Sequence, residues 1–572
     1  MINNKFYLGL YALLIFASIA LGFSFKSKKN PQNILKPNII FILTDDHRAE
    51  ALGYAGNKYA YTPEMDKLAK EGTYFKNALV TTPICAASRA SILSSMHERS
   101  HRYTFQTGDI KQEYMENAYP KILKNEGYFT GFYGKFGLNY KKLDDLFDVH
   151  ENFDRNVKYP DKRGYFFKTI GTDTVHLTRY TGQKAIEFIE KAPKDKPFCL
   201  SLSFSAPHAH DNAPDQYFYD EQTAHLLENQ IIEPPQLGED KYFNAQPNEV
   251  KNGFSRLRWT WRFDEPAKYQ QMVKGYYRMI AGIDFEIAKI RAELKRQGQD
   301  KNTVIILMGD NGYFLGERQL ADKWLMYDKS IRVPLIVYDP RNNFHQDLNE
   351  MALNVDIPAT ILQLANVKQP KIYQGKSLVP LLNKQTPKLN RDAVLIEHLW
   401  EFESIPPSEG VRTKDWKYFR YVNDMSWEEL YNLKTDPLEL YNLAKNPKYR
   451  LVLNQLKKET TVLINKFQDP FLGECTDLNA KFEKSLKFSW DISTKIKSQT
   501  SYQLLASSSK SKIDQNIGDI WNSLQIKSAS SNVNLPENIT LKKGQTIFWK
   551  VRIWDELNRT GEYSQAQTII SY

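Results

Sequence analysis

The chain reads Asn38-Ile39-Ile40-Phe41-Ile42-Leu43-Thr44 near its N-terminus, and the carboxylates of Asp45-Asp46 follow directly. A short, continuous apolar run is typical of a strand that is buried on both faces of a parallel sheet. Further runs of this kind occupy residues 198–204, 304–308 and 333–338. We therefore predict an α/β fold with a mostly parallel sheet flanked by helices.

Segments with helical spacing separate the apolar runs. They lie at residues 63–70, 89–96, 185–190 and 276–294. Thr62 and Pro63 fit the cap and the first position of the first of these helices.

Polar residues follow four of the predicted strands. Asp45-Asp46 follow the first strand, and Gly309-Asp310-Asn311-Gly312 follow the run that begins at Val304. Ala206-Pro207-His208 follow the run through Phe204, and Gly134-Lys135 follow residues 128–133. Ligands of open α/β sheets bind beyond the carboxyl ends of the strands. We therefore expect these side chains to meet at one rim of the sheet.

Three aspartates and one asparagine at this rim form a set of hard oxygen donors. Such donors suit Ca²⁺ or Mg²⁺, whereas Zn²⁺ favours His and Cys. A solvated pair at Asp45-Asp46 and a turn at Asn311-Gly312 are the alternative interpretations. The position of both motifs directly after apolar strands favours a cation site.

Cys85 and Arg89 fit the same rim. Cys85 precedes a helical stretch at residues 86–96, where free N–H groups and the helix dipole favour an anion. Arg89 lies one turn on, and its guanidinium matches a tetrahedral oxyanion. The alternatives are a buried thiol at Cys85, a surface salt bridge at Arg89 and a solvated loop charge at Lys135.

With these motifs in this order, residues 38–467 resemble the formylglycine-dependent (type I) sulfatases of the alkaline-phosphatase superfamily. The matching segments are Pro37 to His47, Cys85-Ala86-Ala87-Ser88-Arg89, Gly134-Lys135, Ala206-Pro207-His208, Gly309-Asp310-Asn311-Gly312, Asp322-Lys323-Trp324 and Arg332-Val333-Pro334-Leu335. The resemblance implies an alkaline-phosphatase-like sheet and a sulfuric ester hydrolase.

The resemblance also implies the roles of individual residues. A formylglycine-generating maturase would oxidise Cys85 to formylglycine, whose hydrated aldehyde attacks sulfur. One Ca²⁺ would be held by Asp45, Asp46, Asp310, Asn311 and the modified Cys85. The implied catalytic residues are Cys85, Arg89, Lys135, His208 and Lys323. Arg89, Lys135 and Lys323 would offset charge on the sulfate oxygens, and His208 or Lys323 would protonate the leaving sugar oxygen.

The sequence departs from the family pattern at two positions. Ala87 stands where many sulfatases have Pro, and Gly137 stands where a His usually follows Gly-Lys and an aromatic residue. We hypothesise that His47 or His101 fills the space of the missing His.

The N-terminus indicates export. Lys5 precedes an apolar stretch at residues 6–23, and Ala20-Leu21-Gly22 suits signal peptidase. We predict a signal peptide at residues 1–24, with an uncleaved anchor as the alternative. The mature protein would be periplasmic or secreted, with no stable membrane partner. Cys85, Cys199 and Cys475 are too few for a disulfide framework, and Cys199 lies in an apolar run.

Length and charge define the organisation and the partners. A chain of 572 residues is too long to fold around a single hydrophobic core. Its net charge of +10 favours anionic partners. Because the Lys and Arg residues are spread along the chain, the charge argues against a nucleic-acid site. We predict a catalytic α/β domain at residues 25–393, an α+β subdomain at 394–482 and a β-sandwich at 483–572.

The predicted sandwich resembles the fibronectin-III-like module of bacterial α-L-rhamnosidases. Apolar and polar residues alternate at 502–505 and 548–555, with turn residues between them. A spacer and a sugar-binding module are both open for this part. Its pairing with a sulfatase implies a sulfated, rhamnose-containing polysaccharide such as ulvan, or its oligosaccharides, as the substrate.

Three functions compete for the whole chain. A sulfatase is favoured by the context of Cys85. A phosphomonoesterase or phosphonate hydrolase of the same superfamily would typically use Thr or Ser at that position and a second metal. A glycan-binding protein with an impaired active site is the alternative that Gly137 leaves open.

Overall fold

A computed structural model describes residues 36–571, except residues 105–106, 154–165, 171, 212, 343, 400–403, 425, 468–474, 483–484, 493–497, 556–559 and 562. The predicted signal peptide, residues 1–24, lies outside the described residues. Within the described part of the chain, no helix is both long enough and apolar enough to cross a membrane.

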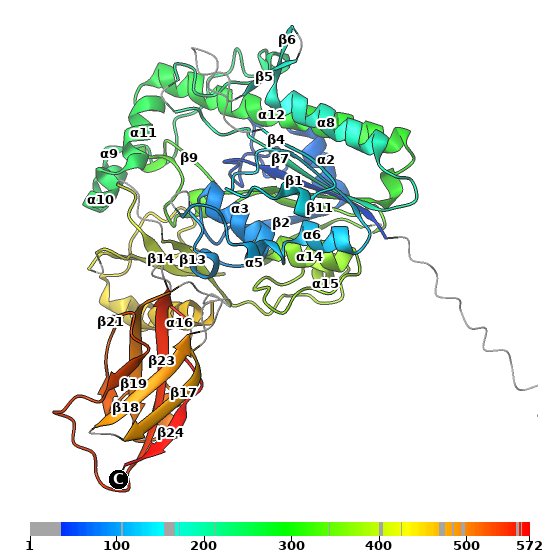
Figure 1. Ribbon diagram of the computed structural model, residues 1–572. Coiled ribbons are helices and arrows are strands. Elements are labelled where there is room, and N and C mark those ends of the chain that lie inside the picture. Colours follow the sequence, from blue (N-terminus) through cyan, green and yellow to red (C-terminus); the bar gives the residue numbers. More distant parts are fainter. Residues whose placement is uncertain are drawn as a thin grey trace, which may run out of the picture. The chain divides into compact units, whose positions relative to one another are not determined.

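A mixed sheet of eight strands forms the centre of the first and larger part of the chain (Figure 1). The order of its strands is β12-β2-β11-β8-β1-β7-β3-β4. Their bounds are β1 (Asn38–Thr44), β2 (Thr73–Leu79), β3 (Phe129–Gly134), β4 (Val149–Asn152), β7 (Phe198–Phe204), β8 (Thr303–Gly309), β11 (Leu335–Tyr338) and β12 (Gln346–Leu353). β1 lies between β7 and β8 and runs parallel to both, with Ile39 opposite Cys199 and Val304. The carboxyl ends of these three strands therefore meet at one edge.

The prediction of a parallel strand at residues 333–338 is wrong in two respects, the direction of the strand and the residue at which it begins. β11 begins at Leu335 and pairs antiparallel with both β8 and β2. An apolar run reports burial on both faces of a sheet, and it carries no information on strand direction.

Helices cover both faces of this sheet. Alternate side chains of β1 point into two cores, because successive side chains of a strand face opposite sides. Ile40 and Ile42 pack in one core with residues of α2 (Pro63–Glu71), α8 (Leu177–Lys191) and α12 (Pro266–Arg296). Ile39, Phe41 and Leu43 pack in the other core with residues of α3 (Cys85–Ser94), α6 (Tyr119–Asn125) and α14 (Asp356–Leu364). Each fully buried Ile, Leu or Phe contributes about 1.5–3 kcal/mol of hydrophobic stabilisation.

The helices differ from their predicted bounds mainly at their ends. α3 begins at Cys85 itself, and α12 extends from Pro266 to Arg296. Thr62 occupies the cap position of α2, but its hydroxyl donates to Asp66 Oδ1 and does not cap the helix. The carboxylate of Asp284, from α12, accepts the N–H groups of Glu64 and Met65. A cap supplied by a distant helix leaves no signal in the local sequence.

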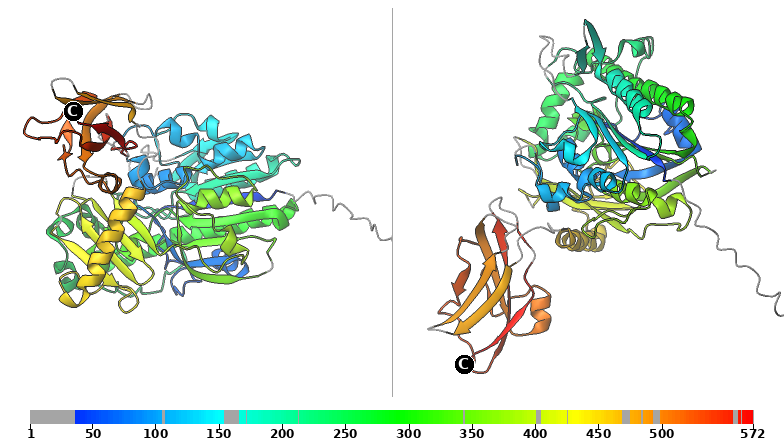
Figure 2. Two further views of the ribbon diagram at one scale, coloured as in Figure 1. Left: turned by 90° about the horizontal axis from the view of Figure 1, so that it is seen from below. Right: turned by 45° about the vertical axis from the view of Figure 1, so that its right-hand side comes forward.

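The C-terminal subdomain contains a four-stranded antiparallel sheet of β13 (Ala393–His398), β14 (Ser408–Thr413), β15 (Trp416–Tyr421) and β16 (Glu428–Asn432). The helix α16 (Arg450–Lys466) covers one face of it (Figure 2). Leu453, Leu456 and Leu463 of the helix pack with Val411 and Leu430 of the sheet.

The last part of the chain is a β-sandwich, as predicted. One sheet contains β17 (Cys475–Phe482), β18 (Leu486–Ile492) and β22 (Asn532–Asn534). The other contains β20 (Trp521–Asn522), β19 (Gln499–Ser507), β21 (Ile526–Lys527), β23 (Thr546–Asp555) and β24 (Gln567–Ile570). Trp490 and Trp549 pack between the sheets. β17 precedes residue 483, the predicted boundary, yet it pairs with β18, so the sandwich begins earlier than the prediction.

Shorter elements connect these parts. They are α4 (Glu98–His101), α5 (Gln112–Met115), α7 (Leu143–Leu146), α9 (Asp240–Asn244), α10 (Asn248–Lys251), α11 (Phe254–Arg262), α13 (Asp328–Ile331), α15 (Val379–Leu382), α17 (Lys510–Asp514), β5 (Phe167–Ile170), β6 (Asp173–His176), β9 (Phe314–Leu315) and β10 (Ala321–Asp322).

Candidate active site

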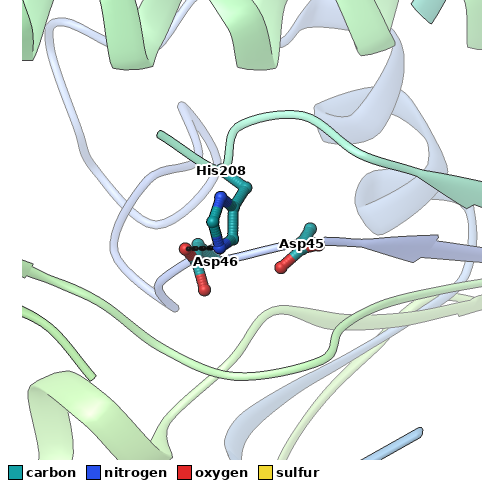
Figure 3. Close-up of side chains that lie close together, drawn as sticks. All are labelled: Asp45, Asp46 and His208. Carbon is teal, nitrogen blue, oxygen red and sulfur yellow. Dashed lines mark ion pairs between the residues drawn. The ribbon is translucent and has the colours of Figure 1, made fainter. Parts of the chain in front are cut away.

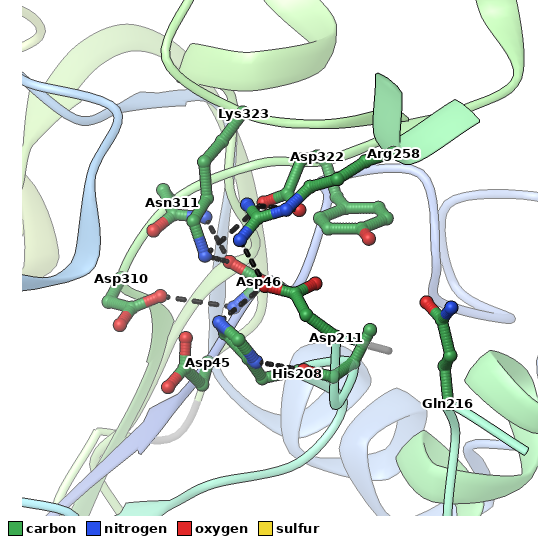
Figure 4. Close-up of polar contacts among 12 residues, drawn as sticks. Asp45, Asp46, His208, Asp211, Gln216, Arg258, Asp310, Asn311, Asp322 and Lys323 are labelled. Carbon is green, nitrogen blue, oxygen red and sulfur yellow. Dashed lines mark hydrogen bonds and ion pairs between the residues drawn. The ribbon is translucent and has the colours of Figure 1, made fainter. Parts of the chain in front are cut away.

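Polar side chains gather where β1, β7, β8 and β3 end, as the sequence predicts. Asp45 and Asp46 follow β1, Asp310 and Asn311 follow β8, Lys135 follows β3, and His208 comes four residues after β7. Lys323 joins them from the loop after β10 (Figure 4). All of these side chains are buried.

Each carboxylate at the rim faces a cationic side chain. Asp45 Oδ2 accepts from Lys135 Nζ at 2.5 Å and lies 3.4 Å from Arg89 Nη2. Asp46 Oδ1 accepts from Lys323 Nζ at 2.5 Å. Arg89 Nε donates to Asp310 Oδ2 at 2.9 Å.

Burial and charge set the ionisation of these groups. Burial raises the pKa of Asp46 to about 7, even though Lys323 lowers it. Burial also raises the pKa of Asp310, and the neighbouring Asp45 adds to the rise. For Asp45 the effect of burial is outweighed by Lys135 and Arg89, so its pKa is lowered. A further positive charge would favour ionisation of all three carboxylates.

Three buried oxygens at the rim have no hydrogen-bond donor among the residues that the structure describes. They are Asp45 Oδ1, Asp46 Oδ2 and Asn311 Oδ1. A buried polar atom without a partner costs about 1–3 kcal/mol. Hard oxygens of this kind are the ligands that Ca²⁺ and Mg²⁺ prefer, so the donor set fits such an ion.

His208 lies against the same carboxylates. Ligand atoms of Asp45, Asp46 and His208 lie within 4.8 Å of one another (Figure 3). His208 Nδ1 is 2.5 Å from the carbonyl oxygen of Ala209, and a carbonyl can only accept, so Nδ1 carries a proton. Nε2 lies 3.6 Å from Asp46 Oδ2 and faces the site.

Cys85 begins α3 and is 4% exposed. Burial raises the pKa of its thiol, although Lys135 and Lys323 lower it. A cysteine that acts as a nucleophile needs a lowered thiol pKa, because the thiolate is the reactive form. The encoded thiol is therefore poorly suited to attack an ester from this position.

Comparison with known proteins agrees with this geometry. The family model for sulfatases matches residues 37–367, more than half of the chain. The chain belongs to the sulfatase family. It is a sulfuric ester hydrolase. A second model, for the C-terminal part of N-sulphoglucosamine sulphohydrolase, matches residues 316–466, and one for the Rha78A-like N-terminal immunoglobulin domain matches residues 480–570.

Several relatives of this sulfatase are known. An N-acetylglucosamine-6-O-sulfatase of Bacteroides thetaiotaomicron is 28% identical, over 76% of this chain and 88% of that protein. An ulvan-active sulfatase of Formosa agariphila is 27% identical, over 76% of this chain and 82% of that protein. A solved structure in complex with its substrate D-glucosamine-2-N,6-O-disulfate has a TM-score of 0.63 at 25% identity, covering 75% of this chain and 98% of that one.

The sulfatase has Gly137 where the family pattern has a His, and the structure shows what lies there. Gly137 adopts a φ of 74°, and a side chain here would place its Cβ atom 2.6 Å from Cδ of Arg89. The stem of Arg89 therefore takes the space beside this position.

The hypothesis that His47 or His101 replaces the missing His does not agree with the contacts of either ring. His47 contacts Thr44 Oγ1 at 3.1 Å and the carbonyl oxygen of Ala51 at 3.0 Å. His101 contacts Ser91 Oγ at 3.1 Å and accepts from the N–H of Tyr103 at 3.0 Å. Both nitrogens of each imidazole are thus engaged by neighbouring groups.

Two residues of the sulfatase site escaped sequence reasoning. Ser203, on β7, accepts from Arg89 Nη1 at 2.5 Å and donates to the carbonyl oxygen of Lys135 at 2.7 Å. Tyr276, on α12, donates to the carbonyl oxygen of Asp46 at 2.8 Å. Asp46 has a φ of 64°, which costs a non-glycine residue about 1–2 kcal/mol, and this contact helps to hold it. A Ser in a strand and a Tyr in a helix give no local signal.

Proposed function

We propose that this sulfatase is exported and hydrolyses sulfate esters on a polysaccharide or its oligosaccharides, with formylglycine formed from Cys85 and with one Ca²⁺. The metal part of this proposal rests on buried oxygens of Asp45, Asp46 and Asn311 that have no hydrogen-bond donor in the part of the chain that the structure describes. They lie at the same rim as the charged groups whose fields reach Cys85.

Asp45, Asp46, Asp310, Asn311 and the modified Cys85 would hold the Ca²⁺. When bound, the ion supplies Lewis-acid polarisation of oxygen atoms in the site. The modified Cys85 supplies a hydrated aldehyde as the nucleophile. A formylglycine-generating maturase is the partner that this modification requires.

The cationic side chains would bind the sulfate group. Arg89, Lys135 and Lys323 are 2–3% exposed, so their charges act in a medium of low dielectric constant. Burial lowers the pKa of Arg89, but its charged neighbours, Asp310 first among them, together raise it by more. The net effect raises the pKa above its ordinary value, so the guanidinium stays charged. These groups would stabilise negative charge that develops on the sulfate oxygens.

His208 is suited to proton transfer to the leaving oxygen. Its Nδ1 is held by the carbonyl oxygen of Ala209, which directs Nε2 toward the site. Protonated Nε2 would donate to the sugar oxygen as the ester bond breaks. Lys323 would bind the same ester from the opposite loop.

We propose ulvan, or another sulfated polysaccharide that contains rhamnose, as the substrate. Two ulvan-active sulfatases of Formosa agariphila are among the relatives, at 27% and 24% identity. The match of residues 480–570 to a Rha78A-like domain supports the same substrate. The net charge of +10 would attract a sulfated polymer.

The arrangement of the chain is part of the proposal. Residues 1–24 would be removed as a signal peptide, and the mature enzyme would be periplasmic or secreted. Residues 25–393 would form the catalytic domain and residues 394–482 the subdomain that closes it. The sandwich from residue 483 on, together with β17, would act as a spacer or a sugar-binding module.

Sulfate release tests the proposed function. The enzyme, produced with a maturase, is incubated with sulfated ulvan oligosaccharides, and free sulfate is measured by ion chromatography. We expect release from ulvan oligosaccharides at a higher kcat/KM than from glucosamine-6-sulfate. Preference for glucosamine-6-sulfate would overturn the ulvan proposal and leave the sulfatase activity standing.

A further inference from the structure

Two arginines of α11 lie next to the active site and belong to none of the motifs described above. Arg258 and Arg262 are four residues apart, so they project from the same side of the helix. Arg262 is fully buried and Arg258 is 9% exposed. Figure 4 shows Arg258 beside Asp322 and Asp211.

Each arginine contacts the same two aspartates. Asp322 Oδ2 accepts from Arg258 Nη1 at 2.7 Å and from Arg262 Nη1 at 2.8 Å. Arg258 Nη2 donates to Asp211 Oδ2, and Arg262 Nη2 donates to Asp211 Oδ1. The four side chains form a closed ring of alternating charge, here called the α11 ring, with no net charge.

The α11 ring joins the two loops that carry His208 and Lys323. Asp211 lies three residues after His208, and Asp322 directly precedes Lys323. Figure 4 shows His208, Asp211, Asp322 and Lys323 around Asp46. A shift of the ring would therefore move both His208 and Lys323, the two groups proposed to contact the sulfate ester.

The backbone around Lys323 needs such support. Asp322 and Trp324, on either side of Lys323, both have a φ of 78°. Non-glycine residues adopt this region at a cost of about 1–2 kcal/mol each. On one side the α11 ring holds Asp322, and on the other the N–H of Trp324 donates to the carbonyl oxygen of Pro83 at 3.0 Å. These contacts fix the direction in which Lys323 leaves the loop.

We propose that Arg258 and Arg262 are positioning residues, which align His208 and Lys323 through Asp211 and Asp322. The inference rests on the proposed roles of His208 and Lys323. Arg262 is also bound by Gln216 Oε1 at 2.5 Å and by Tyr313 at 3.0 Å, so it anchors the ring to the core. Of the two arginines, Arg258 is the more exposed, so it is the one changed in the test.

The leaving group of the ester distinguishes positioning from a structural role. A sulfated sugar leaves as a strongly basic alkoxide and needs a proton from His208, whereas 4-nitrophenol leaves without one. Arg258→Gln is therefore expected to lower kcat on a sulfated sugar about 100-fold and kcat on 4-nitrophenyl sulfate less than about tenfold. Arg258→Lys is expected to recover only part of the loss, because one ammonium cannot bridge both aspartates as the guanidinium does.

Two controls accompany these variants. Arg256→Gln makes the same change on the same helix, where the side chain contacts Gln319 outside the α11 ring. It is expected to retain both activities within about twofold, as is usual for changes outside the reacting geometry. Arg258→Gln/Asp211→Asn restores the neutral charge of the ring, and it is expected to remain impaired on the sugar because the bridge is still broken.

The possible results separate the two hypotheses. Equal losses on both esters, or no loss on the sugar, in Arg258→Gln protein with an unchanged melting temperature would overturn the positioning role while the sulfatase function stands. Recovery of sugar hydrolysis in the double variant would also overturn it, since charge alone would then explain the loss. An unsubstituted enzyme that releases sulfate from neither ester would contradict the proposed function, and the inference with it.

Discussion

At the scale of single residues, Lys135 is the clearest test of the anion site. Its Nζ lies 2.5 Å from Asp45 and its side chain is 4% exposed. Lys135→Ala is expected to lower kcat/KM by about 10²–10³-fold, the effect of removing one preorganised donor. Lys301→Ala is the matched control, because that side chain is 86% exposed. Steady-state sulfate release measures both, and equal activities of the two variants would contradict the role of Lys135.

Asp45 tests the metal site in the same way. Ca²⁺ that binds the folded protein stabilises it by about 2.7 kcal/mol at one hundred times Kd. We expect Ca²⁺ to raise the melting temperature of the chelator-treated enzyme, and we expect Asp45→Asn to abolish this rise because the site loses a charged ligand. Asp300→Asn, at the surface pair with Lys301, should behave like the parent. A full Ca²⁺ response in Asp45→Asn protein would place the ion elsewhere.

The sequence predicted residues of this site that follow strands, and it failed where the contact is made across the fold. Asp45 and Asp310 could be placed because each follows an apolar run directly. Gly137 could not be understood in advance, because the atom that excludes a side chain there belongs to Arg89. Ser203 and Tyr276 contribute single contacts from the middle of regular elements, where no spacing marks them.

At the scale of elements, a buried ion cluster links β15 to α13. Lys417 is fully buried and lies 2.5 Å from both Asp328 and Glu439. Lys417→Met leaves two buried carboxylates without this cation, and breaking such a pair costs about 3–5 kcal/mol. Lys457→Met removes the more exposed pair with Glu428, which contributes about 0–1 kcal/mol. Scanning calorimetry should show a much larger fall in melting temperature for Lys417→Met, and equal shifts would be inconsistent with the cluster.

Elements with strong local patterns were predicted well, and those that depend on partners were not. β1 and β7 have the bounds that their apolar runs predict. The direction of β11 depends on the loop that leads into it, and the cap of α2 depends on Asp284 in α12. Periodicity reports which face is buried, and it does not report which element covers that face.

At the scale of the whole molecule, buried imidazoles predict loss of stability in acid. Burial lowers the pKa of His97 and of His101 to about 3 each. Between about pH 6.5 and pH 3, each of these histidines is protonated in the unfolded chain but not in the folded protein. The free energy of unfolding is therefore unaffected by them above about pH 6.5 and falls progressively as the pH drops toward 3. At about pH 5 the loss is on the order of 2 kcal/mol for each histidine.

His97→Gln measures this contribution. The variant should show a smaller fall in melting temperature between about pH 7.5 and pH 5 than the parent, because its side chain cannot be protonated on unfolding. His225→Gln is the control, since His225 is already exposed in the folded protein. An unchanged pH dependence in the His97→Gln protein would rule out this source of acid sensitivity.

The account depends most directly on the chemical state of residue 85. The enzyme is produced together with a formylglycine-generating maturase, and the peptide that contains Cys85 is analysed by mass spectrometry alongside sulfate release. We predict the mass of formylglycine at this position, and we expect the Cys85→Ala protein to release no sulfate. An intact thiol in protein that releases sulfate at full rate would contradict the proposed nucleophile.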